Sequence, residues 1–351
     1  MGLELMISKN KLSDIGSDSL LHLRIKHFDS EFYRTHGHFD GYADLIDLTY
    51  DELLLHFIRR GYLERRSYNR YFYSYIDGDF YKKKYPELNL QSSEEAVFHW
   101  NYFGAFENRI PNCVTDDLIK SSIHLFQMGK IGSKSIQKAL VVAGHSQLIP
   151  HLHFASEILQ TYPDCFYTYN EVINLSTNPI LFVSGVREPI SRIISGIIES
   201  SADPKSSITI ESVFELINNR EKLEDHIYKD SEIIINWFDH KYYSNIDIYK
   251  YGFDKNRGYQ EYKGDKHRVF VYRYDKLSHL WSRLSEACSL SLESQLENIS
   301  SENNPQAQYI HDKICKTGIS VDLLEKIYKS KYCQYFFTDD EISEFKIKYS
   351  V

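Results

Sequence analysis

The first third of the chain carries the same pattern of aromatic, polar and glycine positions twice. In each copy a Phe-Tyr pair precedes an amphipathic stretch, a glycine and a charged segment. The spacing is identical in the two copies, at His56, Gly61, Glu64, Arg66 and Asn69 and then at His99, Gly104, Glu107, Arg109 and Asn112. Such self-similarity indicates two similar helical units. We therefore predict a small, mostly helical domain at residues 1–115, with repeats at about 28–69 and 76–112.

The glycine of each copy follows an amphipathic stretch, as Gly61 follows residues 51–58. This placement predicts a helix C-cap in which glycine takes the left-handed conformation. For His56 and His99 we expect hydrogen bonds to backbone groups at the helix end, in preference to a ligand role. The module resembles short repeats beside carbohydrate-processing domains in some bacterial enzymes, although only the second copy has their Tyr-Pro and Pro-Asn pairs. The resemblance implies a sugar-binding or scaffolding role.

From residue 116 onward, short apolar runs alternate with amphipathic stretches. The runs predict strands at residues 123–127, 180–183 and 268–273, and the apolar spacing predicts helices at 135–143 and after Pro189. Strands separated by helices are typical of a parallel sheet that binds ligands at the carboxyl ends of its strands. We predict an α/β fold with a parallel β-sheet flanked by helices for residues 116–351. A capping box at Thr338 and Glu341 is expected to open the last helix.

The composition narrows the class of protein. With 351 residues, of which 42% are hydrophobic, the chain can form two folded domains. Its net charge of −8 argues against nucleic-acid binding, so an anion site would need a local group of donors. The 5 cysteines lack metal-ligand spacing, and no apolar run reaches the roughly 18 residues of a membrane span. We expect a cytoplasmic protein with no signal peptide, no transmembrane segment and no metal.

A glycine-containing loop joins the first predicted strand to the first predicted helix. Glycines let the backbone approach an anion, the helix N-terminus offers N–H groups, and Lys130 adds a positive charge. The loop is not a Walker A motif, because Met128 and Ser133 stand where that motif needs glycine. A kinase of the P-loop class is therefore disfavoured, and a plain connecting loop is the remaining alternative. The candidate phosphate ligands are Gly129, Lys130, Ile131, Gly132, Ser133, Lys134 and Ser135.

A second candidate anion site follows the strand predicted at residues 180–183. Arg187 stands at the strand end, and Pro189 suits the first position of a helix. Ser195 lies two turns along that helix. Arg187 and Ser195 can therefore converge on one phosphate, with a guanidinium fork and a hydroxyl. Arg192 fits either this site or a solvated helix face.

The two motifs together resemble those of the sulfotransferases that use 3′-phosphoadenosine-5′-phosphosulfate (PAPS), particularly the carbohydrate-directed branch with its bacterial capsular and exopolysaccharide members. In that family a Lys-x-Gly-Ser/Thr-x-Ser loop, here residues 130–135, cradles the 5′-phosphosulfate. An arginine followed by a serine, here Arg187 and Ser195, holds the 3′-phosphate. The resemblance covers roughly residues 120–351 and implies a P-loop-like sulfotransferase fold. It also likens residues 298–304 to the loop that covers the nucleotide.

A sugar hydroxyl has to lose its proton during such a transfer, so we expect a general base near Lys130. Histidine suits this role because its usual pKa is about 6.5. His151 and His153 share one face of a predicted strand, and the resemblance to relatives that sulfate uronic-acid sugars favours His151. His145 and Glu157 are further candidates, and a packing role for the histidines is the alternative.

The sequence therefore predicts a sulfotransferase that moves a sulfuryl group from PAPS to a hydroxyl of a carbohydrate acceptor. The product of the donor would be 3′,5′-adenosine bisphosphate (PAP). Lys130 is expected to stabilise the leaving phosphate in an in-line displacement, with His151 or His153 as the base. The alternative is an inactive nucleotide- or glycan-binding module of surface-polysaccharide assembly.

Overall fold

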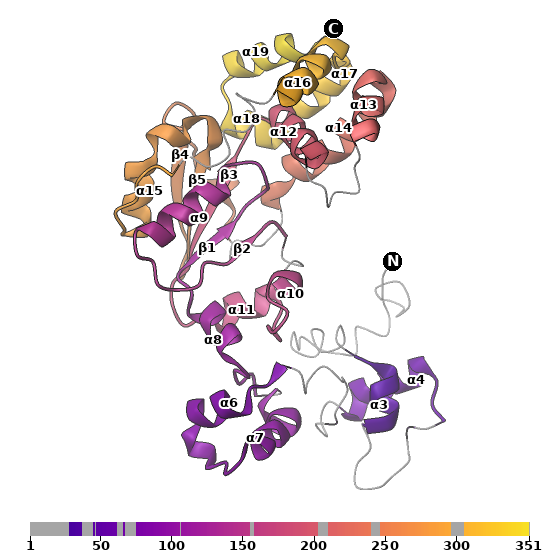
Figure 1. The fold of residues 1–351 in the computed structure, drawn as a ribbon, viewed down its shortest axis with the longest axis vertical. Coiled ribbons are helices and arrows are strands. Elements are labelled where there is room, and N and C mark those ends of the chain that lie inside the picture. The colour runs from indigo at the N-terminus through magenta and orange to yellow at the C-terminus, as the bar shows by residue number, and fades with distance from the viewer. Residues whose placement is uncertain are drawn as a thin grey trace. The chain divides into compact units, whose positions relative to one another are not determined.

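The computed structural model divides the chain into two compact units (Figure 1). One unit comprises the chain up to Asp116 together with Tyr162–Tyr167, and the other comprises Asp117–Thr161 and Thr168–Val351. The division lies beside the predicted boundary at residue 115, but residues 162–167 belong to the first unit. The structure describes residues 28–36, 45, 47–61, 66, 75–105, 107–154, 158–202, 210–239, 246–295 and 305–350.

The two sequence repeats have the same local structure. Each copy is a short helix, a second short helix and one π-helical turn. The N-caps also match, because Thr49 and Ser92 each accept a hydrogen bond from the N–H of a glutamate three residues later. The elements are α3 (Ser30–His36), α4 (Tyr50–His56) and η3 (Phe57–Gly61), then α6 (Gly78–Lys84), α7 (Ser93–His99) and η5 (Trp100–Gly104).

The repeat glycines do not form the predicted left-handed caps. Gly104 ends a π-helical turn without a positive φ. A Cβ atom at this position would collide with the hydroxyl of Tyr81, which is fully buried. That hydroxyl hydrogen-bonds to Nδ1 of His99 at 3.1 Å. The first copy repeats the arrangement with Gly61, Tyr33 and His56. The glycine is thus needed for a close approach, and the histidine is the partner of a buried tyrosine.

Residues 162–167 pack against the second repeat. The ring of Phe166 meets that of Trp100 edge-on at 5.4 Å. The hydroxyl of Tyr167 donates to the carbonyl oxygen of Arg109 at 2.6 Å. The side-chain amide of Asn112 donates to the carbonyl oxygen of Asp164 at 2.8 Å. These contacts explain why this segment belongs to the first unit although its sequence neighbours do not.

The second unit is built on a 5-stranded sheet with the strand order β2-β1-β3-β5-β4. Parallel pairing joins β2 to β1, β1 to β3 and β3 to β5, whereas β4 pairs antiparallel with β5 at the edge. The predicted α/β fold with a helix-flanked sheet is confirmed, and the antiparallel edge strand is an addition to it. The strands are β1 (Ile123–Phe126), β2 (His151–Leu152), β3 (Leu181–Val186), β4 (Tyr259–Lys263) and β5 (Arg268–Arg273).

Successive side chains of β1 face opposite sides of the sheet, as strand geometry requires. Ile123 and Leu125 belong to a core cluster that includes residues of α9 (Ser133–Val142) and α15 (Trp281–Cys288). On the other face, His124 hydrogen-bonds to the hydroxyl of Tyr169 at 2.9 Å, and Phe126 stacks on the same ring at 5.3 Å. Tyr169 opens α11 (Tyr169–Leu175). Figure 1 shows α9 lying along the sheet.

The helix α12 (Pro189–Ala202), which follows β3, packs against α13 (Ile210–Asn218), α14 (Arg220–Ile235) and α16 (Pro305–Thr317). Within the described residues, no helix is long and apolar enough to cross a membrane. The other helical elements are α8 (Cys113–Lys120), α10 (Ile158–Thr161), α17 (Val321–Tyr328), α18 (Lys331–Phe336), α19 (Asp339–Tyr349), η4 (Pro86–Leu88), η7 (Trp237–Asp239), η8 (Ile248–Lys250) and η9 (Tyr274–His279).

The buried carboxylate of Glu188 fixes the start of α12. It accepts hydrogen bonds from the backbone N–H groups of Ile190 and Ser191 at 2.7 and 2.6 Å. The hydroxyls of Tyr328 and Tyr349, from α17 and α19, donate to the same carboxylate. A negative charge at a helix N-terminus is favourable, and the four hydrogen-bond donors of the Glu188 carboxylate compensate for its burial. Glu188 therefore joins α12 to the C-terminal helices.

Arg273 makes a comparable connection at the end of β5. Its side chain is almost fully buried, and it donates to the carboxylates of Asp275 and Glu341, each at a shortest distance of 2.7 Å. Glu341 also completes the predicted capping box with Thr338 at the start of α19. The guanidinium lies over the ring of Phe337 at 4.8 Å. The sheet is thereby connected to the last helix.

We predict that Gly104→Ala lowers the free energy of unfolding by about 1–3 kcal/mol, because the new methyl group displaces the Tyr81 hydroxyl. In a Tyr81→Phe background the same change should cost less, since the hydroxyl is gone. The Cβ would then still lie 3.2 Å from ring carbons of Tyr81 and Trp100. Urea unfolding of the four proteins measures the coupling. Simple additivity of the two changes would contradict the role assigned to this glycine.

Candidate functional site

The predicted phosphate loop lies between β1 and α9, at the carboxyl end of a central strand. Gly132 is the N-cap of α9 and has a φ of 82°, which glycine adopts without strain. A Cβ at this position would lie 2.8 Å from Cδ2 of Leu277. In the first turn of the helix Ser133 and Ser135 are buried, whereas Lys134 is exposed. The first turn of a helix carries N–H groups without intrahelical partners, so the position suits an anion.

The carbonyl groups of this loop are held by side chains from elsewhere in the second unit. The donors come from the end of β2, from α12, from the end of β3 and from β5. The hydrogen bonds from these donors to the carbonyl groups hold the loop backbone in its conformation. The pairs are His153 Nδ1 with Gln127 O at 2.8 Å, Arg192 Nε with Gly129 O at 3.3 Å, Arg187 with Lys130 O at 2.9 Å, and the Tyr272 hydroxyl with Ile131 O at 2.6 Å.

Four cationic side chains gather around the loop. Burial, followed by the positive charges of Lys134, Arg192 and Arg187, lowers the pKa of Lys130 to about 8. Burial also lowers the pKa of Arg187 and of Arg192. Repulsion among like charges is relieved when an anion binds between them. The loop therefore has the electrostatics of an anion site within a chain whose net charge is −8.

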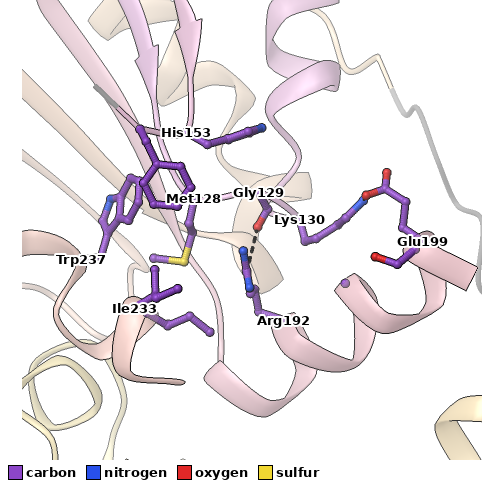
Figure 2. Close-up of a pocket in the computed structure, with 12 residues that line it drawn as sticks. Met128, Gly129, Lys130, His153, Arg192, Glu199, Ile233 and Trp237 are labelled. Atoms are coloured by element: carbon purple, nitrogen blue, oxygen red, sulfur yellow. Dashed lines mark hydrogen bonds and ion pairs between the residues drawn. The ribbon is translucent and has the colours of Figure 1, made fainter. Parts of the chain in front are cut away.

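Two carboxylates balance part of this charge. The ammonium of Lys130 forms an ion pair with Glu199 of α12, as Figure 2 shows. That carboxylate favours the charged ammonium and so opposes the effect of burial on Lys130. Arg192 lies 3.6 Å from a carboxylate oxygen of Asp230 in α14. Glu199 is half exposed, so its ion pair can exchange with an incoming anion at small cost.

A pocket of about 240 Å³ opens beside the loop. Figure 2 shows Lys130 and Glu199 at one side of it and Trp237 with Ile233 at the other. The pocket thus combines charged groups with an apolar aromatic surface. It is lined by Met128, Gly129, Lys130, His153, Phe154, Arg192, Gly196, Glu199, Ser200, Ile233, Ile234 and Trp237.

The histidines differ in their relation to Lys130. His153 lines the pocket together with Lys130. Since the Gln127 carbonyl can only accept, Nδ1 of His153 carries the hydrogen, and Nε2 of the neutral ring keeps its lone pair. His151 lies in β2 with its ring 5.2 Å from that of His153, and its Nδ1 contacts the side chain of Gln137. His153 is therefore a lining residue of the pocket, whereas His151, which the sequence favoured, is not.

The other predicted residues occupy different surroundings. Arg187 reaches the loop, and its Nε also donates to the hydroxyl of Ser191 at 3.2 Å. Ser195 lies one turn beyond Ser191 on α12, so both face the same side of the helix. His145 follows the C-terminal end of α9, about 15 Å of helix away from the loop. Glu157 and residues 298–304 lie outside the described residues.

Sequence reasoning missed much of the pocket. Glu199 and Phe154 gave no signal, because one is a charged residue on a polar helix face and the other follows a short strand. Arg192 was left open between a site and a solvated face, and the structure brings it into the pocket. Trp237 lies 35 residues beyond the end of α12, so no local pattern relates it to the loop. Among the described residues, no group of three or more metal-ligating side chains occurs.

Comparisons of the chain with protein-family models, with curated proteins and with solved structures gave no match.

We predict that Gly132→Ala destabilises the protein more than Gly144→Ala. Both glycines have a φ of 82°, so each substitution carries the cost of a left-handed alanine, about 1–2 kcal/mol. Only Gly132 also meets a side chain, whereas no described residue lies within 4 Å of a Cβ at Gly144. The added cost at Gly132 should be about 1–3 kcal/mol in urea unfolding. Equal costs at the two positions would show that Leu277 does not constrain the loop.

Proposed function

We propose that this protein is a sulfotransferase that moves a sulfuryl group from PAPS to a hydroxyl of a carbohydrate. The observation that carries the proposal is the loop after β1, whose carbonyls are fixed by other side chains and whose surroundings are cationic. A P-loop-like sulfotransferase fold is part of the proposal. It is supported by parallel strands in the order β2-β1-β3-β5 with the loop at the end of a central strand.

The residues present fit the phosphosulfate end of the donor. Glycine at 132 and the first turn of α9 offer backbone N–H groups, and Ser133 lies in that turn. Lys130 would bind the oxygen that separates from sulfur, where negative charge develops. Arg187 and Ser195 would bind the 3′-phosphate, because both lie next to Ser191 on one side of α12. The two phosphate sites are adjacent, since Arg187 also binds the Lys130 carbonyl.

His153 is the general base of this proposal. Its Nδ1 is held by the Gln127 carbonyl, so Nε2 can accept the proton of an acceptor hydroxyl in the pocket. A base fixed by a hydrogen bond on its other nitrogen is a recurring arrangement in acid–base catalysis. The acceptor hydroxyl would attack sulfur on the side opposite the leaving phosphate.

A second candidate function is a nucleotide- or glycan-binding module without transfer activity. It is favoured by one observation, the ion pair of Lys130 with Glu199. A lysine neutralised in this way contributes nothing to a leaving group unless the pair exchanges. The two functions differ in product, because a binding module would bind PAP and leave the glycan unsulfated.

The test is incubation of the full-length protein with PAPS and unsulfated glycans of the native host, followed by mass spectrometry. A sulfate added to one of the glycans supports the proposal. PAP should raise the melting temperature of the protein, because a ligand of the folded state stabilises it by mass action. Stabilisation by PAP without sulfate transfer would favour the binding module, and the absence of both would reject the donor site.

We predict that Lys130→Ala reduces sulfate transfer by about 10²–10³-fold, the effect of losing one preorganised charge in a transition state. The affinity for PAP should fall by less than about tenfold, since the other cations and the helix N-terminus remain. Lys138→Ala is the matched control, because it removes the same charge from an exposed position of α9. Wild-type turnover by Lys130→Ala would reject the role of this lysine.

We also predict that the affinity for PAP falls as the pH rises through about 8, the value to which its surroundings lower the pKa of Lys130. Below that pH the lysine is a cation that attracts the phosphates, and above it the lysine is neutral. The phosphates are already ionised in this range, since their last pKa is about 6. Calorimetric titrations against pH measure the effect. In Lys130→Arg the decline should disappear, because arginine stays charged; an unchanged decline would assign it to another group.

A further inference from the structure

The pocket beside Lys130 has two ends of different chemistry. Lys130 and Glu199 make one end charged. Phe154, Trp237 and Ile233 make the other end apolar. Figure 2 shows Trp237 and Ile233 on the side of the pocket away from Glu199. A ligand that fills the pocket therefore has both a polar and an apolar part.

The apolar end is a rigid aromatic surface. Trp237 is only 3% exposed, and its ring stacks on that of Phe126 in β1, with centroids 5.6 Å apart. Phe126 stacks in turn on Tyr169 at 5.3 Å, so the line of rings extends to the helix on that face of the sheet. Phe154 meets Trp237 edge-on at 6.0 Å and is 45% exposed. The ring of Phe154 is thus partly exposed to solvent and packs against the buried ring of Trp237.

Polar groups lie between the two ends. His153 and Arg192 line the pocket, and both are positioned by loop carbonyls, of Gln127 and Gly129. Figure 2 shows Arg192 and Gly129 between Trp237 and Glu199. A few placed donors beside an apolar surface are typical of sites for small polar molecules with one apolar face.

A sugar ring has this character, because its C–H groups form an apolar face and its hydroxyls form a polar rim. Aromatic rings attract such C–H faces, and donors and acceptors beside them bind the hydroxyls. The pocket volume of about 240 Å³ lies below the roughly 300–1,000 Å³ of sites that enclose a drug-sized ligand. A pocket of this volume has room for one sugar ring.

We propose that the Phe154–Trp237 end of the pocket is the acceptor subsite, and that it binds the C–H face of a single sugar ring. A ring bound there presents its rim to His153 and, beyond it, to Lys130. The acceptor role rests on the proposed function, which supplies the donor on the other side of Lys130. Sugar binding itself needs no donor, so the subsite can be tested separately from transfer.

The test uses the full chain labelled with fluorotryptophan and observed by fluorine NMR. The chain has 3 tryptophans, so a Trp237→Phe variant identifies the resonance in the pocket. Methyl glycosides of galactose, glucose, mannose and N-acetylglucosamine are the probes. We expect at least one of them to shift the Trp237 resonance saturably, while those of Trp100 and Trp281 stay in place. Neither of these tryptophans is among the residues that line the pocket.

Phe154 is the residue to change. Phe154→Ala should weaken the binding of that glycoside by about tenfold, and Phe154→Tyr, which keeps the ring, should leave it within about twofold. Phe214→Ala is the matched control, because Phe214 is 36% exposed on α13 and does not line the pocket. PAP binding should be the same in wild type and Phe154→Ala, which also shows that the variant is folded.

The outcomes separate the subsite from the proposed function. Absence of any saturable shift, or equal shifts in wild type and Phe154→Ala, would overturn the subsite. Weaker PAP binding in Phe154→Ala with unchanged sugar binding would also overturn it, and would assign the aromatic end to a nucleobase. Phe154-dependent sugar binding without sulfate transfer would support the subsite and reject the sulfotransferase. Sulfate transfer by Phe154→Ala with an unchanged KM for the acceptor would support the sulfotransferase and reject the subsite.

Discussion

The loop between β1 and α9 owes its conformation to side chains that bind its carbonyl groups. A buried carbonyl without a partner costs about 1–3 kcal/mol, so the loop backbone depends on these donors. Arg192, Arg187 and Tyr272 supply three of them, from α12, from the end of β3 and from β5. The form of the loop therefore depends on the sheet and on α12, and the start of α12 is itself fixed by the buried carboxylate of Glu188.

The same hydrogen bonds determine the electrostatics of the site. Two of the donors are arginines, so satisfying the carbonyls also brings positive charge to the loop. Arg187 and Arg192 add to burial and to Lys134 in lowering the pKa of Lys130. Glu199 offsets part of the charge, and its exposure makes that ion pair exchangeable. Structural support and anion attraction thus come from the same side chains, which is why a chain of net negative charge can hold an anion site.

In the N-terminal repeats, the sequence pattern indicates the local structure but not the contact that requires the glycine. Histidine and glycine recur at matched spacing, and the two copies have matching helices and N-caps. The predicted role of the repeat glycine as a left-handed helix cap was wrong. A helix followed by glycine usually indicates a left-handed cap, whereas Gly104 leaves room for the hydroxyl of Tyr81. That tyrosine lies more than 20 residues earlier, and only the packed unit shows the contact.

Sequence alone determined the features that depend on local spacing. These are the strands β1, β3 and β5, the helices α9 and α12, the capping box at Thr338, and the glycine–lysine loop at a helix N-terminus. The tertiary structure alone decided which side chains meet at that loop. His153 rather than His151 reaches the pocket, and Trp237 and Glu199 join it from later segments. The physical reason is that register and helix orientation select the convergent residues, and both depend on packing between segments far apart in the chain.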